Sequence, residues 1–302
     1  MCGSERGIDV TTSSANAAVI RARYPRTTAN LGRYAGAPRR AMDSFGQMVW
    51  FTLVSIGQIP LTLRRYRAET TRLIAQIGMG TGALAVIGGT LAIVAFITLS
   101  GASLVAIQGF SSLGNIGVDV FTGFFAALVN VRIAAPVVTG IALAATVGAG
   151  ATAELGAMRI SEEIDALEVM GVKSLAFLAS TRIIAAVVVI LPLYGLAMIM
   201  AFLSPQLVTT LFYGQSSGTY NHYFRTFLRP EDVYWSFLVA VIIATVVMIT
   251  HCFYGYTAAG GPVGVGDAVG RSMRFSLAAV VIVAMLSSLA LYGVDPNFNL
   301  SV

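Results

Sequence analysis

Long apolar stretches with almost no charged residues dominate the sequence after residue 73. They cover about residues 74–100, 121–150, 178–203, 233–258 and 275–293. An α-helix needs roughly 20 apolar residues to cross the hydrocarbon core of a membrane, and each stretch is about that long. The pattern therefore predicts an all-α integral membrane protein with five membrane-spanning helices.

The residues before the first stretch predict a helix that lies on the membrane rather than across it. Ser44 and Gln47 have the spacing of a capping box at a helix start. The apolar run that follows is interrupted by Pro60 and is too short to span. We predict an interfacial elbow helix over residues 44–72 and a disordered cytosolic tail over residues 1–43.

One further stretch, residues 101–118, is apolar enough to form a re-entrant element or a sixth span. A sixth span would reverse the orientation of every later helix and place most later arginines outside the cell. Basic residues concentrate on the cytosolic side of membrane proteins, so this arrangement is disfavoured. We therefore predict five spans and assign residues 101–118 to none of them.

The composition narrows the class of protein and its orientation. Hydrophobic residues make up 56% of the 302-residue chain and charged residues 11%, whereas soluble domains carry roughly 25% charged residues. Eleven of the 19 basic residues precede residue 73. We therefore expect a cytosolic N-terminus and, after five spans, an external C-terminus. The net charge of +5 indicates membrane orientation and not a nucleic-acid partner.

The connection between the second and third stretches is the most polar part of the membrane half. Residues 154–173 hold five carboxylates against two basic residues, Arg159 and Lys173. Ser161 is a suitable start and Gly171 a suitable end for a short amphipathic helix. An acidic surface is repelled by anionic lipid headgroups, which favours a basic protein partner. From the residues alone, a solvated connector remains the alternative.

Three stretches carry a resemblance to a known family. The run from Ala153 to Val172, AELGAMRISEEIDALEVMGV, closely resembles the signature of the MlaE/YrbE permeases, the membrane subunits of Mce-associated ABC lipid transporters. Residues 131–139 and the loop 255–268 also agree with that family. The resemblance covers roughly residues 44–293, and the arginine-rich composition favours an actinobacterial YrbE-type member.

The resemblance implies a coupling role for the acidic connection. Residues 156–171 would form a cytosolic coupling helix within a transmembrane permease domain of residues 73–302, and this helix would dock in a groove of a separate ABC ATPase. The residues implied for this contact are Glu154, Arg159, Glu162, Glu163, Asp165 and Glu168. ATP and Mg²⁺ would bind to the ATPase, and this chain would hold no cofactor and no metal.

The resemblance also implies further partners and a location in the bacterial cytoplasmic membrane. A second YrbE-type permease would complete the transport path as a heterodimer, with a homodimer as the alternative. The substrate would be a membrane lipid: a fatty acid, phospholipid, sterol or mycolic-type lipid. The external loop 204–231 would face the Mce proteins, with Tyr220, His222, Arg225 and Arg229 as candidate docking residues.

Arg132 falls inside the second apolar stretch and is a candidate residue of the transport cavity. An arginine at the centre of a membrane costs about 2.5–3.5 kcal/mol on insertion scales, so it would face a partner or a wet cavity. Alternatively, the span begins at Ile133 and Arg132 is interfacial. The chain departs from the family at Ile133, where a glutamate is usual, and near Thr146, where an arginine is usual.

Other function classes fit the sequence less well. Residues 214–218 match G-x-S-x-G, but they lie in a predicted external loop and not in the strand-to-helix turn of a nucleophile elbow. The single lysine, Lys173, is not part of a P-loop, so we expect no ATP hydrolysis in this chain. An ion-coupled secondary transporter would need carboxylates inside the membrane, and the predicted membrane interiors contain none. That class and a non-transporting scaffold for the Mce assembly remain the alternatives.

Overall fold

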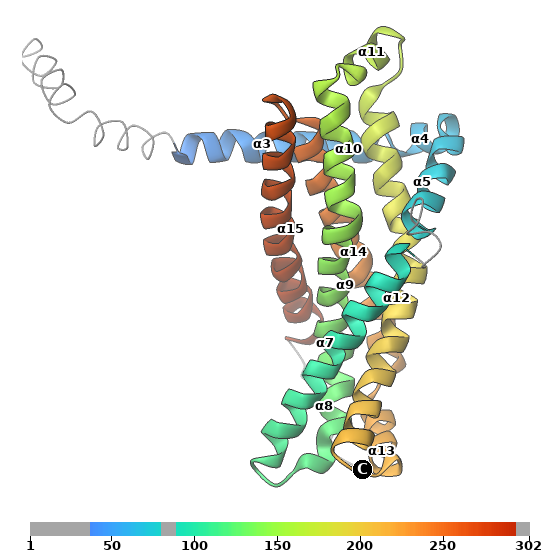
Figure 1. Ribbon diagram of the computed structural model, residues 1–302, viewed down its shortest axis with the longest axis vertical. Helices are drawn as coiled ribbons and strands as arrows, with labels where there is room; N and C mark the ends of the chain where they lie inside the picture. Colours follow the sequence, from blue (N-terminus) through green and yellow to red (C-terminus); the bar gives the residue numbers. More distant parts are fainter. Residues whose placement is uncertain (1–36, 80–88, 294–302) are drawn as a thin grey trace, which may run out of the picture. The chain divides into compact units, whose positions relative to one another are not determined.

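The computed structural model describes residues 37–79 and 89–293, and the described part of the chain is helical with no strand (Figure 1). The chain forms two units, residues 1–51 and 52–302. Helix α3 (Ala37–Gly57) crosses this division, so it begins before the predicted start at Ser44. The rest of the predicted tail lies outside the described residues.

Helix α3 is amphipathic and exposes a large apolar surface. Phe45, Trp50 and Leu53 are each at least 62% exposed. Helices α4 (Ile59–Arg65) and α5 (Arg67–Met79) follow, so the predicted helix over 44–72 consists of three shorter helices. Pro60 fits this break because proline is tolerated in the first turn of a helix, where α4 places it. An interfacial position for this region stays a prediction.

Five long apolar helical segments confirm the predicted number of spans. The first is α7 (Gly89–Gly114), and the last two are α14 (Pro230–Tyr256) and α15 (Gly261–Tyr292). The second segment runs through η1 (Asp119–Phe121), α8 (Thr122–Val129), η2 (Asn130–Ala134), α9 (Ala135–Leu143), η3 (Ala144–Gly148) and α10 (Ala149–Ile160). The third runs through η4 (Leu175–Ser180), α12 (Thr181–Leu207) and η5 (Val208–Phe212). Two short helices, α11 (Glu163–Val169) and α13 (Ser217–Phe227), lie between spans.

Two span boundaries differ clearly from the sequence prediction. The first long helix begins at Gly89 and continues to Gly114, so most of residues 101–118 belongs to the first span. The predicted start at residue 74 falls in α5, and residues 80–88 lie outside the described part of the chain. The last helix begins at Gly261 rather than residue 275, because Gly260 adopts φ 97° at its N-cap and Pro262 fits its first turn. Arg271 and Arg274 lie inside this helix and do not end it.

The five spans are buried to very different extents. In the most apolar 18-residue stretch of each span, the buried share is 67% for α14, 22% for α7 and 17% for α15. Helix α14 packs against α10, α12 and α15, and α12 packs against α7 and α5. The central position of α14 leaves α7 and α15 at the periphery, with broad apolar faces that the described residues do not cover.

Small residues allow the second span to approach α14 closely. A Cβ added at Gly148 would lie 2.5 Å from the ring of His251, and one added at Gly255 would lie 2.9 Å from Leu155. His251 is fully buried, with Nδ1 2.8 Å from the Thr152 hydroxyl and Nε2 3.1 Å from the Ser276 hydroxyl. Its ring therefore joins α14 to α10 and α15 and has no open space to move into.

We expect Gly148→Ala to lower the free energy of unfolding by about 1–3 kcal/mol, because overpacking would displace the held His251 ring. Gly150→Ala is the matched control, since no atom lies within 4 Å of a Cβ added there. Alanine also favours a helix over glycine by up to about 1 kcal/mol, so the control should be neutral or stabilising. Unfolding in mild detergent, followed by circular dichroism, measures both. Equal destabilisation would contradict the close packing at Gly148.

Candidate functional site

The acidic connection between the second and third spans is a helix, a sharp turn and a second short helix. Helix α10 ends at Ile160, and Glu162 adopts φ 61° between α10 and α11. The predicted start at Ser161 is therefore corrected: α11 begins at Glu163, and the Ser161 hydroxyl bonds the Glu163 carboxylate instead of capping a backbone N–H. Gly171, with φ 76°, follows the helix end as predicted. A left-handed non-glycine residue such as Glu162 is strained by about 1–3 kcal/mol, and such residues cluster at functional sites.

Several contacts hold α11 and the residues on either side of it in place. We call this part of the chain, residues 159–174, the α11 segment. Ile164 is fully buried and anchors the helix. Arg159 on α10 pairs with Asp165 at 2.6 Å, and Glu168 accepts a hydrogen bond of 2.5 Å from the Ser174 hydroxyl. Of the residues predicted for ATPase coupling, Arg159, Asp165 and Glu168 therefore have partners within the segment.

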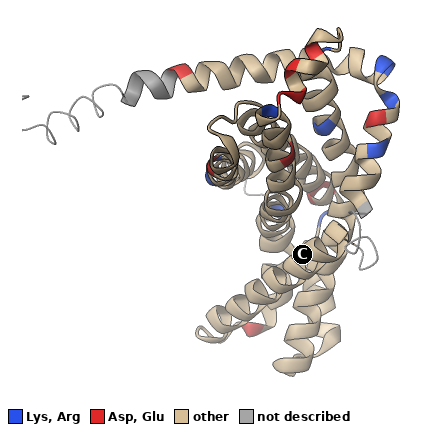
Figure 2. Cartoon of the chain, turned by 45° about the horizontal axis from the view of Figure 1, so that its top comes forward, with Lys and Arg blue, Asp and Glu red and all other residues tan. Residues whose placement is uncertain are grey.

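The outer surface of this segment combines negative charge with exposed apolar side chains. Glu162 and Glu163 are exposed, and Val169 and Met170 are 89% and 69% exposed. Figure 2 shows charged residues gathered around α11 and along α4 and α5, while long parts of the spanning helices carry none. A surface of this kind suits a protein groove that offers basic residues around an apolar centre.

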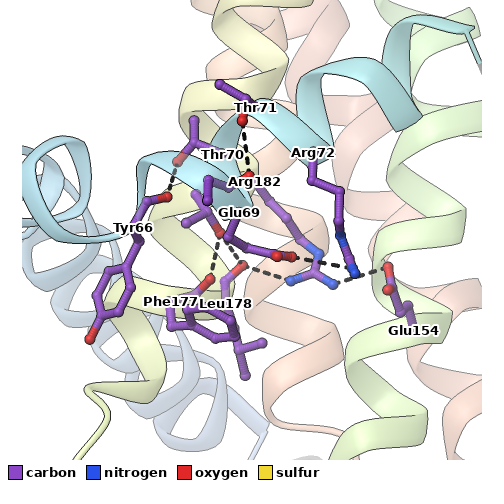
Figure 3. Close-up of polar contacts among 11 residues, drawn as sticks. Tyr66, Glu69, Thr70, Thr71, Arg72, Glu154, Phe177, Leu178 and Arg182 are labelled. Atoms are coloured by element: carbon purple, nitrogen blue, oxygen red, sulfur yellow. Dashed lines mark hydrogen bonds and ion pairs between the residues drawn. The ribbon is translucent and has the colours of Figure 1, made fainter.

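Glu154 lies on α10, outside α11, and it pairs with a buried arginine. Its Oε2 lies 3.0 Å from Nη2 of Arg182 on α12, and the Arg182 side chain is only 6% exposed. Arg182 also donates from Nη1 to the Leu178 carbonyl at 2.9 Å. Figure 3 shows Arg182 between Leu178 and Glu154, beside Glu69 and Arg72 of α5. Glu154 thus neutralises a buried cation at the base of the α11 segment.

A second buried ion pair lies at the other end of the same span. Nη2 of Arg132 in η2 lies 2.9 Å from Oδ2 of Asp232, in the first turn of α14, and the two side chains are 13% and 9% exposed. The Arg132 guanidinium also lies over the Tyr292 ring of α15, 4.2 Å from its centroid. Arg132 therefore lies inside the second long helical segment, and Asp232 supplies the partner that a buried arginine requires. Its role in a transport cavity stays a prediction.

The carboxylates of both pairs lie toward the ends of their spanning segments, so the prediction that the membrane interiors contain no carboxylate stays a prediction. Asp232 and Glu154 both lie within spanning helices. Residues 132 and 154 are about 33 Å apart along the helix axis at 1.5 Å per residue, which is close to the thickness of a hydrocarbon core. The two ion pairs therefore cannot both lie at the centre of the membrane.

Wide helical turns of the π type occur beside both ion pairs. η2 contains Arg132, and η4 ends directly before α12, which carries Arg182. Such turns interrupt regular backbone bonding and are frequent at functional sites. Near η2, the Ser236 hydroxyl donates to the Val131 carbonyl at 2.6 Å and also bonds the Tyr194 hydroxyl. Three spans thus contribute to the surroundings of Arg132.

Helix α13 presents a polar surface at the end of the bundle opposite α11. His222 and Arg225 are exposed, and an open groove of about 400 Å³ is lined by Gly218, Asn221, His222, Arg225 and Thr226. Arg229 is exposed and pairs with Glu231 at 3.5 Å.

Tyr220 is the exception among the four predicted docking residues. Its side chain is 1% exposed and packs α13 onto α8, so the prediction that it lies on the docking surface is corrected. Burial raises the pKa of the Tyr220 phenol well above its usual value, and the hydroxyl has no hydrogen-bond partner in the described part of the chain. A Cβ at Gly123 would lie 2.5 Å from the Tyr220 carbonyl, which explains the close packing of the two helices.

Comparison with known proteins identifies the class to which these features belong. The family model described as Permease MlaE matches residues 79–290, which includes all five spans and the α11 segment except for the last residues of α15. The chain belongs to the MlaE permease family.

Relatives of this MlaE-family permease occur in bacteria and plants. It is 28% identical to the chloroplastic protein TRIGALACTOSYLDIACYLGLYCEROL 1 of Arabidopsis thaliana over 58% of this chain and 50% of that protein. It is 27% identical to a probable ABC transporter permease protein of Rickettsia bellii over 59% of this chain and 69% of that protein. A probable ABC transporter permease protein of Synechocystis is 27% identical over 49% of this chain and 56% of the relative. The chain therefore spans only about half to two thirds of the length of these relatives.

Sequence reasoning about this MlaE-family permease missed Asp232 and Arg182 as members of buried ion pairs. Both were placed at the edges of predicted spans, where charge is ordinary. Arg132 and Glu154 lie in apolar helices, so each needs a residue of opposite charge beside it, and this need points to such partners. The sequence alone offers no way to choose which distant residue supplies it.

We expect Asp232→Asn to lower the free energy of unfolding by about 3–5 kcal/mol, because it leaves the Arg132 cation buried without its counter-charge. Glu231→Gln is the matched control on the neighbouring residue. Its carboxylate is 72% exposed and pairs with an exposed arginine, so its loss should cost at most about 1 kcal/mol. Thermal unfolding of the purified protein in detergent compares the two. If the two variants were equally stable, the conclusion that the Arg132–Asp232 pair is buried away from solvent would be wrong.

Proposed function

We propose that the chain is the membrane permease subunit of an ATP-driven lipid transporter. The observation that carries the proposal is the acidic α11 segment between two spans of an MlaE-family permease, held at its base by the Arg182–Glu154 pair. The relatives named as ABC transporter permeases support the same class. ATP and Mg²⁺ would then bind in a separate ATPase subunit.

The α11 segment has the properties of a coupling element for that ATPase. Glu162, Glu163, Val169 and Met170 supply an exposed acidic and apolar surface, while buried Ile164 and the Arg159–Asp165 pair keep the helix in place. A force applied to this surface would reach α10 directly and α12 through η4, since the segment connects those elements. The proposed cytosolic side is therefore the α11 end, which agrees with the positive-inside pattern of the sequence.

A second permease subunit would cover the apolar faces that this chain leaves open. α7 exposes Phe96 and Leu104, and α15 exposes Met285 and Leu289, each by at least 64%. These two helices are also the least buried of the five spans. We infer a dimer with a related YrbE-type permease, or with a second copy of this chain, that encloses a path for a fatty acid, phospholipid, sterol or mycolic-type lipid.

The α13 end would receive the Mce proteins on the external side. Besides the polar surface of His222, Arg225 and Arg229, this end exposes Leu211 and Phe212 by 74% and 82%. A polar helix beside exposed apolar residues is typical of a protein interface. The protein would thus lie in the bacterial cytoplasmic membrane with Mce proteins and ATPase at opposite ends.

Charge reversal at α11 tests the ATPase contact. We expect Glu162→Lys combined with Glu163→Lys to reduce ATPase co-purification from native membranes at least tenfold and to abolish lipid uptake, because an acidic contact surface becomes basic. Both residues are exposed, so folding should be preserved. The readouts are ATPase recovery by quantitative mass spectrometry and uptake of labelled lipid. Normal uptake by this variant would rule out the coupling role and favour a secondary transporter or a scaffold.

Charge reversal at α13 is the reciprocal test of the Mce contact. We expect Arg225→Glu to reduce recovery of Mce proteins several-fold while the ATPase stays bound, because Arg225 lies on the exposed surface opposite α11. The α11 variant should show the opposite pattern, so each variant controls for general misfolding of the other. Loss of both partners in both variants would contradict two separate docking surfaces.

A further inference from the structure

A partly open cavity of about 470 Å³ lies near the α11 end of the bundle, between α5, α7, the second span, α12 and α14. Its volume is in the range of small-molecule sites. Leu73, Ile77, Ile93, Val147 and Met248 supply apolar walls. Gly150 and Ala151 keep the α10 side of the cavity free of bulky side chains. The cavity is thus shaped mainly by apolar groups, as a hydrocarbon chain requires.

One end of the cavity is polar and is built around the Glu154–Arg182 pair. Arg182 is almost fully buried, and its two Nη atoms bond the Leu178 carbonyl and Glu154 Oε2. The Glu154 side chain is 43% exposed, and its Oε1 accepts no hydrogen bond from the described residues. Gln76 and Thr90 also line the cavity, and their side chains make no hydrogen bond within the described chain. Three polar groups are therefore available to a ligand.

The charge balance at this end selects the type of headgroup. The arginine is enclosed and neutralised, whereas the carboxylate is the exposed member of the pair. An anionic headgroup would approach a carboxylate and be repelled. A hydroxyl can donate to Glu154 Oε1 and accept from the Gln76 amide or the Thr90 hydroxyl, and a hydrogen bond to an ionised acceptor is stronger than a neutral one.

We propose that this cavity binds a single-chain amphiphile with an uncharged hydroxyl headgroup, with the hydroxyl at Glu154 and the chain between Ile77, Ile93 and Met248. The polar end of the cavity is separate from Arg132, because Glu154 lies about 33 Å from Arg132 along the second span. It is also separate from the exposed surface of α11. The choice of a lipid as ligand rests on the proposed transport function, but the binding itself requires no ATPase.

Photocrosslinking to the full-length protein in lipid nanodiscs tests this site. The probe is a sixteen-carbon alcohol that carries a diazirine in its chain, and labelled residues are located by peptide mass spectrometry. We expect the label on the parts of α5, α7, α10, α12 or α14 that line the cavity. We also expect competition by unlabelled hexadecanol at a concentration at least tenfold lower than by hexadecanoate of the same chain length.

Two substitutions sharpen the test. Gly150→Leu adds a side chain at the cavity lining, where nothing lies within 4 Å of an added Cβ, and it should reduce labelling at least tenfold. Gly195→Leu on α12 is the matched control, since it is equally unobstructed and lies outside the cavity lining. Glu154→Gln leaves Arg182 without its counter-charge, so we expect hexadecanoate to compete as well as hexadecanol or better.

Each outcome decides the proposal. Labelling that is equal in Gly150→Leu and in the unmodified protein, or a label confined to other helices, overturns the site. Equal competition by alcohol and carboxylate in the unmodified protein overturns the headgroup assignment. Because these readouts need neither nucleotide nor transport, a protein that fails to recruit an ATPase but binds the alcohol would refute the proposed transporter and retain the site.

Discussion

The need to neutralise two buried arginines determines how the helices of this protein are joined. A guanidinium in an apolar environment is stable only with a counter-charge beside it. Asp232 meets that need for Arg132 and joins the second span to α14, while the Tyr292 ring adds α15 to the same contact. Glu154 meets it for Arg182 and joins α10 to α12. Hydrophobic packing alone would allow these helices to slide along one another, because lipid and side chains are equally apolar. The two ion pairs therefore favour one alignment of these helices along their axes.

Hydrogen bonds between neutral groups also join α14 to its neighbouring helices. His251 bonds both Thr152 and Ser276, and Ser236 bonds the Val131 carbonyl. Glycines such as Gly148 permit the short distances that these bonds need. The central helix is therefore held by hydroxyl and imidazole groups as well as by shape, which is consistent with its position as the most buried span.

Much of this architecture follows from the sequence, but its polar contacts do not. Charge-free stretches predict five spans because an apolar helix in a membrane is decided by local composition. The break at Ser161 and Glu162 escaped prediction, because Ser161 has the side chain of a helix start while the structure gives Glu162 the left-handed conformation. Residues 101–114 were assigned to no span, since apolar composition continues through the region and does not fix where a helix begins. The partners of Arg132 and Arg182 depend on tertiary packing between distant helices. Tyr220 was predicted on a surface because the family resemblance implies that the loop 204–231 faces the Mce proteins, yet the small Gly123 allows it to be buried.

The position of Glu154 links the α11 segment to the cavity. This residue closes the base of the α10–α11–α12 connection through Arg182, and it also lines the cavity with a carboxylate oxygen that has no partner among the described residues. A movement of α11 that shifted α10 relative to α12 would change the distance between Glu154 and Arg182, because these residues lie on those two helices. Lengthening that contact would uncover a positive charge in a cavity that is now neutral, and an uncovered arginine attracts anionic headgroups in place of hydroxyls. If α11 is the proposed coupling element, mechanical coupling and the proposed ligand preference would depend on the same ion pair, and a partner that moves α11 would also change what the cavity accepts.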